Sequence, residues 1–236
     1  MTKPVAVLTG AGAGLSASLA RLLHKNGYAI RLAARDIDKL ADLIDETEAE
    51  AFICDVRSAD DVNGIFENLP GPLRVAVAHP SARVRGPLTE LDPEKVRLAI
   101  DVTAYGSFLV GQAAAKVMLT QEPDEKGTLG TILFTGASAG VKGFPQSAPF
   151  AMGKFAQRGL SQSMSRELHP KGVHVAWVNV DGGIRNEARP ERIESADNPD
   201  SMLDPDAIAE TYLALINQHR SAWSEEVAVR PWVEKF

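Results

Sequence analysis

Short apolar segments alternate with longer segments of helical spacing along the whole of this 236-residue chain. Apolar segments of this length, bounded by turn residues and separated by helical patterns, are typical of strands in a parallel sheet covered on both faces. The alternation predicts a doubly wound α/β fold of the Rossmann type with about seven strands. We expect these strands at residues 5–9, 28–33, 51–54, 75–78, 131–135, 173–178 and 226–229.

Between the expected strands, apolar residues recur every three or four positions, as they do on one face of a helix. The clearest start signal is Asp92-Pro93, an Asp cap followed by a proline in the first turn. We expect helices over about 15–26, from about 37, around 62–66, and over 93–119, 150–168 and 205–218.

No repeat or linker divides the chain, so we expect a single domain, residues 1–236. Residues 185–203 are polar and lack any period. A connection of this length in a compact domain is often a lid. We therefore expect a mobile flap at about 185–203.

Composition excludes several classes of function. The 25 basic and 31 acidic residues are spread along the chain without a Lys/Arg cluster, so we expect neither nucleic acid nor an anionic membrane as a partner. No stretch approaches ~18 uninterrupted apolar residues, and we expect no membrane-spanning segment. The single cysteine, Cys54, excludes an internal disulfide, the N-terminus resembles no targeting signal, and both favour the cytoplasm. No spacing typical of metal ligands is present.

A glycine-rich segment, residues 9–16, joins the first strand to the first helix and reads Thr-Gly-Ala-Gly-Ala-Gly-Leu-Ser. Glycines let the backbone approach a diphosphate, and a helix N-terminus supplies free N–H groups and a partial positive charge. We expect a dinucleotide bound at Gly10, Ala13, Gly14 and Leu15. The alternative is a tight turn without a ligand.

Residues that follow the second and third expected strands indicate which dinucleotide binds. Asp55-Val56 follows the third strand, where a carboxylate can accept from an adenine amino group. Arg35 follows the second strand, where a guanidinium suits a ribose 2′-phosphate. We therefore favour NADP(H) over NAD(H). The neighbouring Asp36 weakens this inference, and the alternative for Arg35 is a solvated residue in the first helical turn.

These motifs resemble those of the short-chain dehydrogenase/reductase family over nearly the whole chain. Thr9, Gly10 and Gly14 match its phosphate loop, Asp55-Val56 matches its Asp-Val, and Lys154 matches its catalytic lysine. The resemblance implies a nicotinamide cofactor held also by Lys154 and by Ile184, which follows the family's Pro-Gly position. It also implies a homodimer or homotetramer formed through the long helices.

The resemblance breaks down at the catalytic residues. Phe150 occupies the place of the family's tyrosine, Ala137 that of its serine and Thr103 that of its asparagine. The segment Ala-His-Pro-Ser at 78–81 replaces Asn-Asn-Ala-Gly, and Ser16 replaces the last glycine of the phosphate loop. In these respects the chain is similar to a small bacterial group with phenylalanine in the tyrosine place.

Phe150 has no proton to give, and loss of a general acid typically costs ~10²–10⁴ in rate. Lys154 becomes a candidate donor if an apolar pocket depresses its pKa. Ser138, Ser147, His79 and Asp181 are weaker candidates, each with a structural role as the alternative.

Two functions remain open at the level of the sequence. The first is an NADP(H)-dependent oxidoreductase with an altered site, acting on a small-molecule substrate that needs no strong protein acid. The second is a cofactor-binding sensor or partner subunit without redox catalysis. The substrate itself is not encoded in any motif of the flap.

Overall fold

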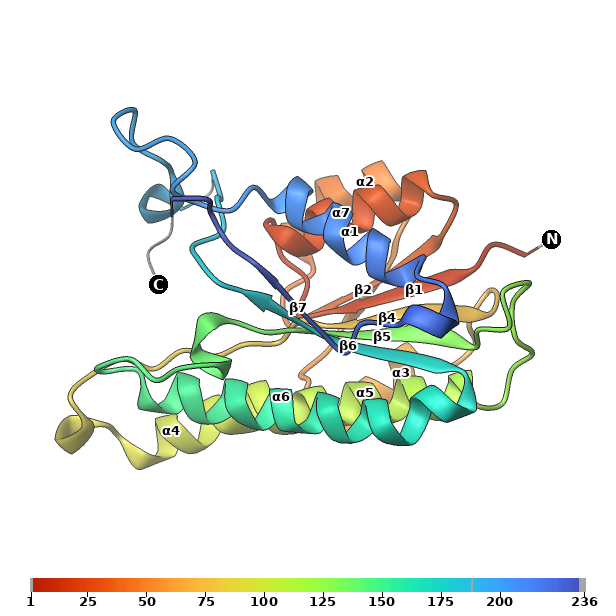
Figure 1. The fold of residues 1–236 in the computed structure, drawn as a ribbon, viewed down its shortest axis with the longest axis horizontal. Helices are drawn as coiled ribbons and strands as arrows, with labels where there is room; N and C mark the ends of the chain where they lie inside the picture. The colour runs from red at the N-terminus through yellow and green to blue at the C-terminus, as the bar shows by residue number, and fades with distance from the viewer. Residues whose placement is uncertain (1, 188, 234–236) are drawn as a thin grey trace.

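The computed structural model describes residues 2–187 and 189–233. Residues 1 and 234–236 of the expected domain, and residue 188 of the expected flap, lie outside the described residues. Within the described residues, seven parallel strands form one sheet in the order β3-β2-β1-β4-β5-β6-β7 (Figure 1). The strands are β1 (Val5–Thr9), β2 (Ala29–Ala34), β3 (Glu50–Ile53), β4 (Leu73–Ala78), β5 (Gly130–Thr135), β6 (Val173–Val180) and β7 (Glu226–Val229). The predicted fold class is confirmed.

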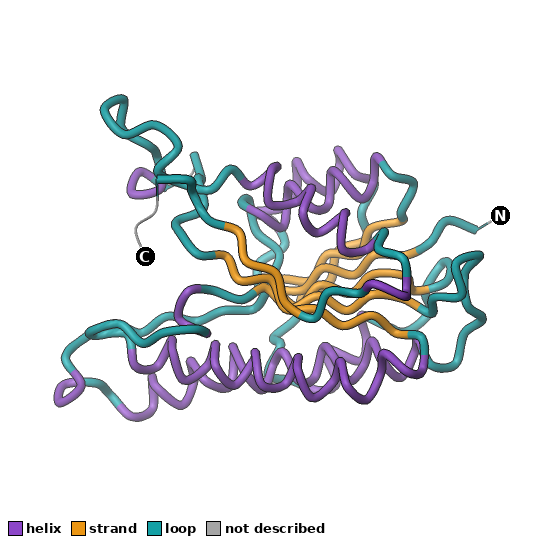
Figure 2. Tube along the Cα trace, viewed as in Figure 1, coloured by secondary structure: helices purple, strands orange, loops and turns teal. Residues whose placement is uncertain are grey.

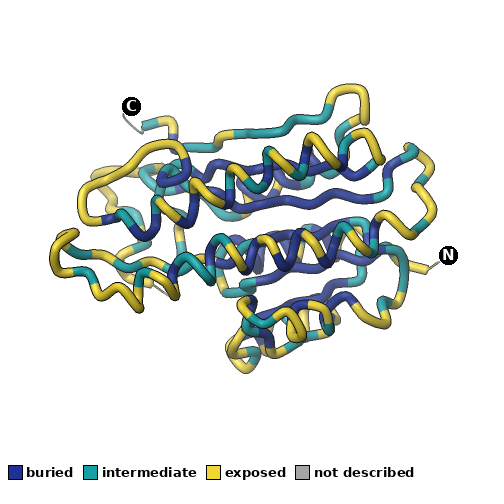
Figure 3. Tube along the Cα trace, turned by 90° about the horizontal axis from the view of Figure 1, so that it is seen from below, coloured by how far each residue is buried: buried dark blue, intermediate teal, exposed yellow. Residues whose placement is uncertain are grey.

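Helices cover both faces of the sheet (Figure 2). One layer holds α1 (Leu15–Lys25), α2 (Ala41–Thr47) and α7 (Pro205–Ile216). The other holds α3 (Ala59–Ile65), α4 (Pro93–Ile100), α5 (Gly106–Met118) and α6 (Ala148–Leu168). Each face of the sheet has its own apolar cluster beneath these helices. Figure 3, seen from below, shows buried and exposed positions alternating along the helices of the second layer.

All seven strands lie within two residues of their predicted ends. The helix predicted over 93–119 is instead divided, because a π-helical segment, Asp101–Tyr105, separates α4 from α5. The helix predicted from about 37 begins as a 3₁₀ turn at Asp38–Leu40 before α2. The spacing of apolar residues does not distinguish a 3₁₀ turn or a π-helical turn from an α-helix.

The inner strand β2 carries a buried charge that its apolar pattern did not predict. Arg31 is 3% exposed, and its Nε donates to Glu50 at 2.8 Å. Its two terminal nitrogens donate to the carbonyl oxygens of Ile65, Glu67 and Asn68 at 2.6–2.8 Å. Arg31 therefore satisfies orphan carbonyls at the end of α3 and ties this short helix to the sheet.

One helical stretch bears on the expectation about membrane spans. By length and composition, Pro93–Met118 could cross a bilayer, although 56% of its most apolar window is buried inside the protein. The sequence analysis did not single out this stretch because it counted uninterrupted apolar runs, whereas mean hydropathy tolerates a few charges. The α5 part of the stretch packs against β4 and β5, as the core helix of a globular domain does.

The predicted flap, residues 185–203, is closed at its base. Ile184 pairs with Leu203 in an isolated parallel bridge, and the backbone N–H of Arg185 donates to Leu203 O at 2.9 Å. Between these ends, a 3₁₀ turn at Pro190–Arg192 is the one helical piece among the described residues. The mobility of the flap stays a prediction.

Close packing beneath the loop after β5 yields a test of the fold. A Cβ added to Gly136 would lie 2.7 Å from Nε1 of Trp177 and nearer still to two ring carbons. Because Trp177 is 1% exposed and enclosed, it has no room to move away. We expect Gly136→Ala to lower the free energy of unfolding by about 1–3 kcal/mol in urea titrations.

Gly143→Ala is the matched control, because no atom lies within 4 Å of a Cβ at that position. It should change stability by less than about 0.5 kcal/mol. Trp177→Phe removes the ring atoms that the new methyl would strike, so the double variant with Gly136→Ala should lose less stability than the sum of the two. Additive losses would contradict the clash.

Candidate functional site

The glycine loop and the loop after β4 meet at the carboxyl edge of the sheet. Gly10 has a φ of +71°, and a Cβ here would lie 2.9 Å from Pro80 N and 3.0 Å from His79 C. Only glycine permits both this conformation and this approach. Helix α1 then begins at Leu15, with Gly14 as N-cap, no side-chain cap and no acidic residue in its first turn. Uncapped N–H groups at a helix N-terminus fit a diphosphate.

The flap reaches the same loop. Asn186 Nδ2 lies 3.3 Å from where a Cβ on Gly14 would stand. Ala13 is exposed, whereas Leu15 is 2% exposed and faces the core. The structure thus brings the predicted phosphate-binding residues together beneath the start of the flap, which Ile184 anchors.

The expected adenosine end lies behind β2 and β3. Arg35 is exposed and makes no hydrogen bond or ion pair with the described residues, while Asp36 pairs with Lys39 at 2.6 Å. Asp55 is engaged by Arg57, whose Nε donates to Oδ1 at 2.9 Å and Oδ2 at 3.0 Å. This hydrogen bonding holds the pKa of the Asp55 carboxyl below its usual value. An adenine amino group would therefore share the Asp55 oxygens with Arg57.

Arg57 is a residue that the sequence reasoning missed. Its spacing, two residues after Asp55, was the signal that could have found it. Val56, between them, is 8% exposed, and a Cβ on Gly106 would lie 2.8 Å from its Cγ2. The side chain of Val56 packs on α5, which leaves its backbone for contact with a ligand.

Lys154 lies inside the protein at the end of β5. It is 2% exposed, and its Nζ donates to Thr135 O at 2.7 Å and to Gln157 Oε1 at 3.2 Å. Gln157 donates in turn to Ser107 Oγ at 2.8 Å, and Ser107 Oγ donates to Thr103 O at 2.6 Å. A buried chain of hydrogen bonds therefore runs from the lysine to the π-helical segment.

Burial changes the protonation of two groups at this edge. It lowers the pKa of Lys154 to about 7, with a smaller contribution from the charge of Arg83. It lowers the pKa of His79 to about 4, with a smaller contribution from Lys154. Near pH 7 Lys154 is therefore divided between ammonium and amine, while His79 is neutral. His79 Nδ1 is buried without a hydrogen-bond partner among the residues described.

Thr103, in the asparagine place, sits in the π-helical segment and is 1% exposed. Its Oγ1 accepts from the backbone N–H of Ala82 at 3.1 Å. A Cβ on Gly153 would lie 2.9 Å from Thr103 Cβ, so α6 approaches closely here. Single π-helical turns inside α-helices often occur at functional sites. Here the turn holds the loop after β4 against α6.

Phe150, which we expect to occupy the tyrosine place, is 6% exposed and lies beneath a guanidinium group. Arg83 Cζ stands 4.3 Å from the centre of the Phe150 ring. Ala137, in the serine place, adopts an extended conformation at the start of the 3₁₀ turn Ser138–Gly140. Sequence reasoning missed Arg83, because no local pattern marks a contact between residues so far apart in the chain.

The weaker candidates for a proton donor, Asp181, Ser138 and Ser147, differ from Lys154 in their hydrogen-bond and ion-pair partners. Asp181 pairs with Arg230 at 3.4 Å. Ser138 and Ser147 flank the site, and neither hydroxyl hydrogen-bonds to another described side chain. No described group of three or more His, Cys, Asp or Glu side chains could hold a metal ion.

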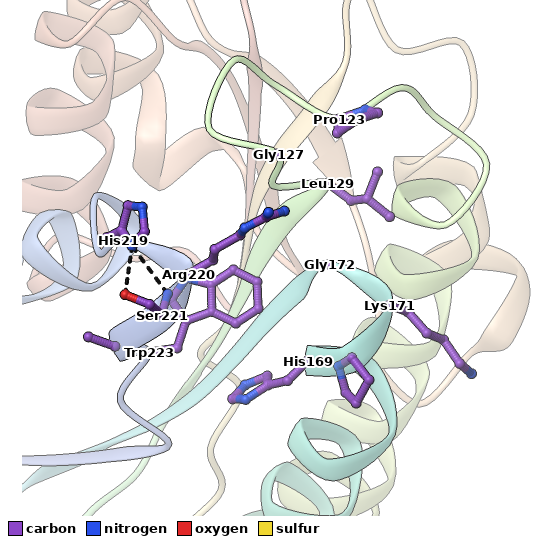
Figure 4. Close-up of a pocket in the computed structure, with 12 residues that line it drawn as sticks. Pro123, Gly127, Leu129, His169, Lys171, Gly172, His219, Arg220, Ser221 and Trp223 are labelled. Carbon is purple, nitrogen blue, oxygen red and sulfur yellow. Dashed lines mark hydrogen bonds between the residues drawn. The ribbon is translucent and has the colours of Figure 1, made fainter.

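A cavity of about 780 Å³ lies at the opposite edge of the sheet, where β6 begins (Figure 4). His169 and Trp223 line it, with ring centres 5.2 Å apart, and His174 stacks on Trp223 at 4.9 Å. This aromatic cluster holds the chain that leads into β7 against β6. It is remote from the glycine loop and from Lys154.

Comparisons with known proteins agree with this geometry. The family model described as short chain dehydrogenase matches residues 4–193. An uncharacterized oxidoreductase of Staphylococcus aureus (strain N315) is 26% identical over 98% of each chain. A short-chain dehydrogenase from Rhodopseudomonas palustris is 29% identical, with 97% of this chain and 99% of that one covered and a TM-score of 0.80. A metagenomic short-chain oxidoreductase solved with NADP is 27% identical over 99% of each chain, with a TM-score of 0.81.

The family model spans well over half of the chain, and the relatives align along nearly all of it. This chain therefore belongs to the short-chain dehydrogenase family.

Proposed function

We propose that this protein is an oxidoreductase that uses NADP(H) and gives the substrate its proton from Lys154 in place of a tyrosine. The observation that carries the proposal is a lysine at the carboxyl edge of the sheet, buried and with its pKa lowered to about 7. A group whose pKa lies near the working pH is a suitable general acid.

Proton donation by Lys154 agrees with its hydrogen bonds. An ammonium group has three N–H donors, and only two find acceptors among the described atoms, Thr135 O and Gln157 Oε1. The third is available to a ligand. After it has given up its proton, the neutral amine is the form that the dry interior favours.

The residues of the carboxyl edge fit the cofactor that the family implies. The backbone around Gly10 and Gly14 would hold the diphosphate, and the unpartnered His79 Nδ1 offers a polar atom beside it. A bound nicotinamide would supply or accept the hydride. The protein would then have to bind the substrate, exclude water and move one proton.

The preference for NADP(H) rests on two guanidinium groups at the adenosine end. Arg35 is exposed and unpaired within the described chain, and Arg57 lies beside Asp55. Charge from Arg35 also lowers the pKa of Asp55, so these groups share one surface. The similar metagenomic oxidoreductase was solved with NADP, which supports the same choice.

The alternative of a redox-inactive sensor or partner subunit is less favoured. The family is one of oxidoreductases, and the buried lysine keeps a pKa useful for chemistry. We also propose that the chain belongs to a subgroup with phenylalanine in the tyrosine place, on the spacing of Phe150 and Lys154. A cytoplasmic location fits the lone, buried thiol of Cys54.

We further propose a homodimer or homotetramer formed through α4, α5 and α6. Large apolar side chains are exposed along these helices, although α5 and α6 already pack on the sheet and α4 packs on α6. They are Leu98, Tyr105, Phe108, Met152 and Phe155, each between 39% and 52% exposed. Exposed apolar patches of this kind mark protein–protein interfaces.

Cofactor binding is tested by calorimetric titration with NADPH and NADH. We expect NADPH to bind at least ~10-fold more tightly, because hydrogen bonds to charged groups contribute about 1.5–3 kcal/mol. Arg35→Ala should weaken NADPH binding and leave NADH unchanged. Arg166→Ala, remote on α6, is the control. Equal affinities for both coenzymes would contradict the assignment of Arg35.

The acid role of Lys154 is tested on a panel of imines, enones and ketones with NADPH. The ammonium form falls as pH rises through about 7, so kcat/KM for reduction should fall up to tenfold per pH unit above 7. Lys154→Met should abolish turnover, while Lys171→Met, exposed near the other edge, should not. Turnover that is independent of pH from 6 to 9 would contradict proton donation by Lys154.

Assembly is tested by analytical ultracentrifugation. Phe108→Glu places a charge in the exposed apolar row, and we expect it to shift the protein toward monomer. Ile53→Glu is the control, because Ile53 is also apolar and exposed but lies at the β3 edge. A wild-type chain that is monomeric at micromolar concentration would exclude this proposal.

A further inference from the structure

Arg83 presents its donors at the mouth of the candidate site. It lies on the loop after β4, and its guanidinium carbon stands over the ring of Phe150, 4.3 Å from the ring centre. A guanidinium group carries five N–H donors in a planar fork. Arg83 makes no hydrogen bond or ion pair with any part of the chain that the structure describes. The N–H donors of the Arg83 guanidinium are therefore available to a ligand.

Two more arginines approach the same place without acidic partners. Arg83 and Arg85 are exposed, and Arg192 is half-buried. Partial desolvation lowers the pKa of Arg83, and the positive charges of Arg85 and Arg192 lower it further. Arg192 extends from the flap, with Nη1 2.8 Å from where a Cβ on Gly183 would stand. Neither Arg85 nor Arg192 has an ion pair within residues 2–187 and 189–233.

This concentration of charge is unusual for the molecule. The chain carries a net charge of −6, and many of its other arginines have an acidic partner. Those in ion pairs are Arg21, Arg31, Arg57, Arg97, Arg158, Arg166, Arg185 and Arg230. Three like charges held together without a counterion repel one another. A bound anion would remove this repulsion.

The cluster is next to the proposed proton donor. Arg83 stands over the ring of Phe150, which lies one helical turn before Lys154 on α6, and its charge contributes to lowering the pKa of Lys154. The expected diphosphate site is at Gly10 and Gly14, under the flap residue Asn186, and needs no contribution from Arg83. The anion that suits Arg83 is therefore one carried by the second ligand.

We infer that the substrate carries an oxyanion, a carboxylate or a phosphate ester, which Arg83 binds through its paired N–H donors while Arg85 and Arg192 add attraction. This inference rests on the proposed function, because it names the substrate class of the same site. Guanidinium groups bind carboxylates and phosphates bidentately. The anionic group is held at Arg83, and the rest of the substrate can then reach toward Lys154.

The test is calorimetry on protein saturated with NADPH, with benzoate, phenyl phosphate and benzamide as probes. Benzamide has nearly the shape of benzoate without the charge. We expect at least one anionic probe to bind ~10-fold or more tightly than benzamide, and the preferred anion distinguishes a carboxylate from a phosphate. Arg83→Gln should weaken that binding by about 10- to 100-fold. Arg83→Lys, which keeps the charge but not the fork, should fall between.

Arg220→Gln is the matched control, since it removes the same charge at the opposite edge of the sheet, beside the cavity in Figure 4. NADPH affinity of the Arg83 variants should equal that of wild type, which separates this inference from cofactor binding. Equal or undetectable binding of all three probes would overturn it, as would anion binding that Arg83→Gln leaves unchanged. Failure of NADPH itself to bind would instead contradict the proposed function.

Discussion

The site depends on one close approach, between the backbone of Gly10 after β1 and that of Pro80 after β4. These strands are neighbours in the sheet although two strands separate them in the chain. From β1 the chain continues to β2 on one side, and from β4 it continues to β5 on the other side. The loops that follow β1 and β4 therefore run in opposite directions and leave a crevice between them. A Cβ on Gly10 would lie only 2.9 Å from Pro80 N, so no side chain fits at this position. The same contact places His79 and the Arg83 loop above the start of α1.

A second constraint is the buried polar chain behind the crevice. Lys154, Gln157, Ser107 and Thr103 join α6 to the π-helical segment through three hydrogen bonds of 2.6–3.2 Å. Buried polar groups are tolerated when they are hydrogen-bonded, and a satisfied network makes a core specific. The π-helical turn offers Thr103 O to Ser107 and Thr103 Oγ1 to Ala82 at once. These hydrogen bonds hold Lys154 in the protein interior, where burial disfavours its charged form.

Much of the fold could be predicted from the sequence, and much of the site could not. The strands were predictable because buried parallel strands are short, apolar and separated by helical spacing. The glycine loop was predictable because its chemistry is local. Arg31 and the stacking of Arg83 on Phe150 were not, since each joins residues 19 to 67 positions apart and depends on packing alone. The Arg57–Asp55 pair is local, yet it was overlooked because a role in adenine binding was already assigned to Asp55.

The replaced residues of the site form a consistent set. A tyrosine at position 150 would bring a hydroxyl whose proton the lysine helps to move; phenylalanine brings a flat apolar face instead. That face supports the guanidinium of Arg83, and Arg83 in turn helps to lower the pKa of Lys154. A phenyl ring at position 150 is therefore compatible with the proposed arrangement, in which Lys154 gives the proton and Arg83 binds an anion, because the ring lies against the arginine and leaves proton donation to the lysine.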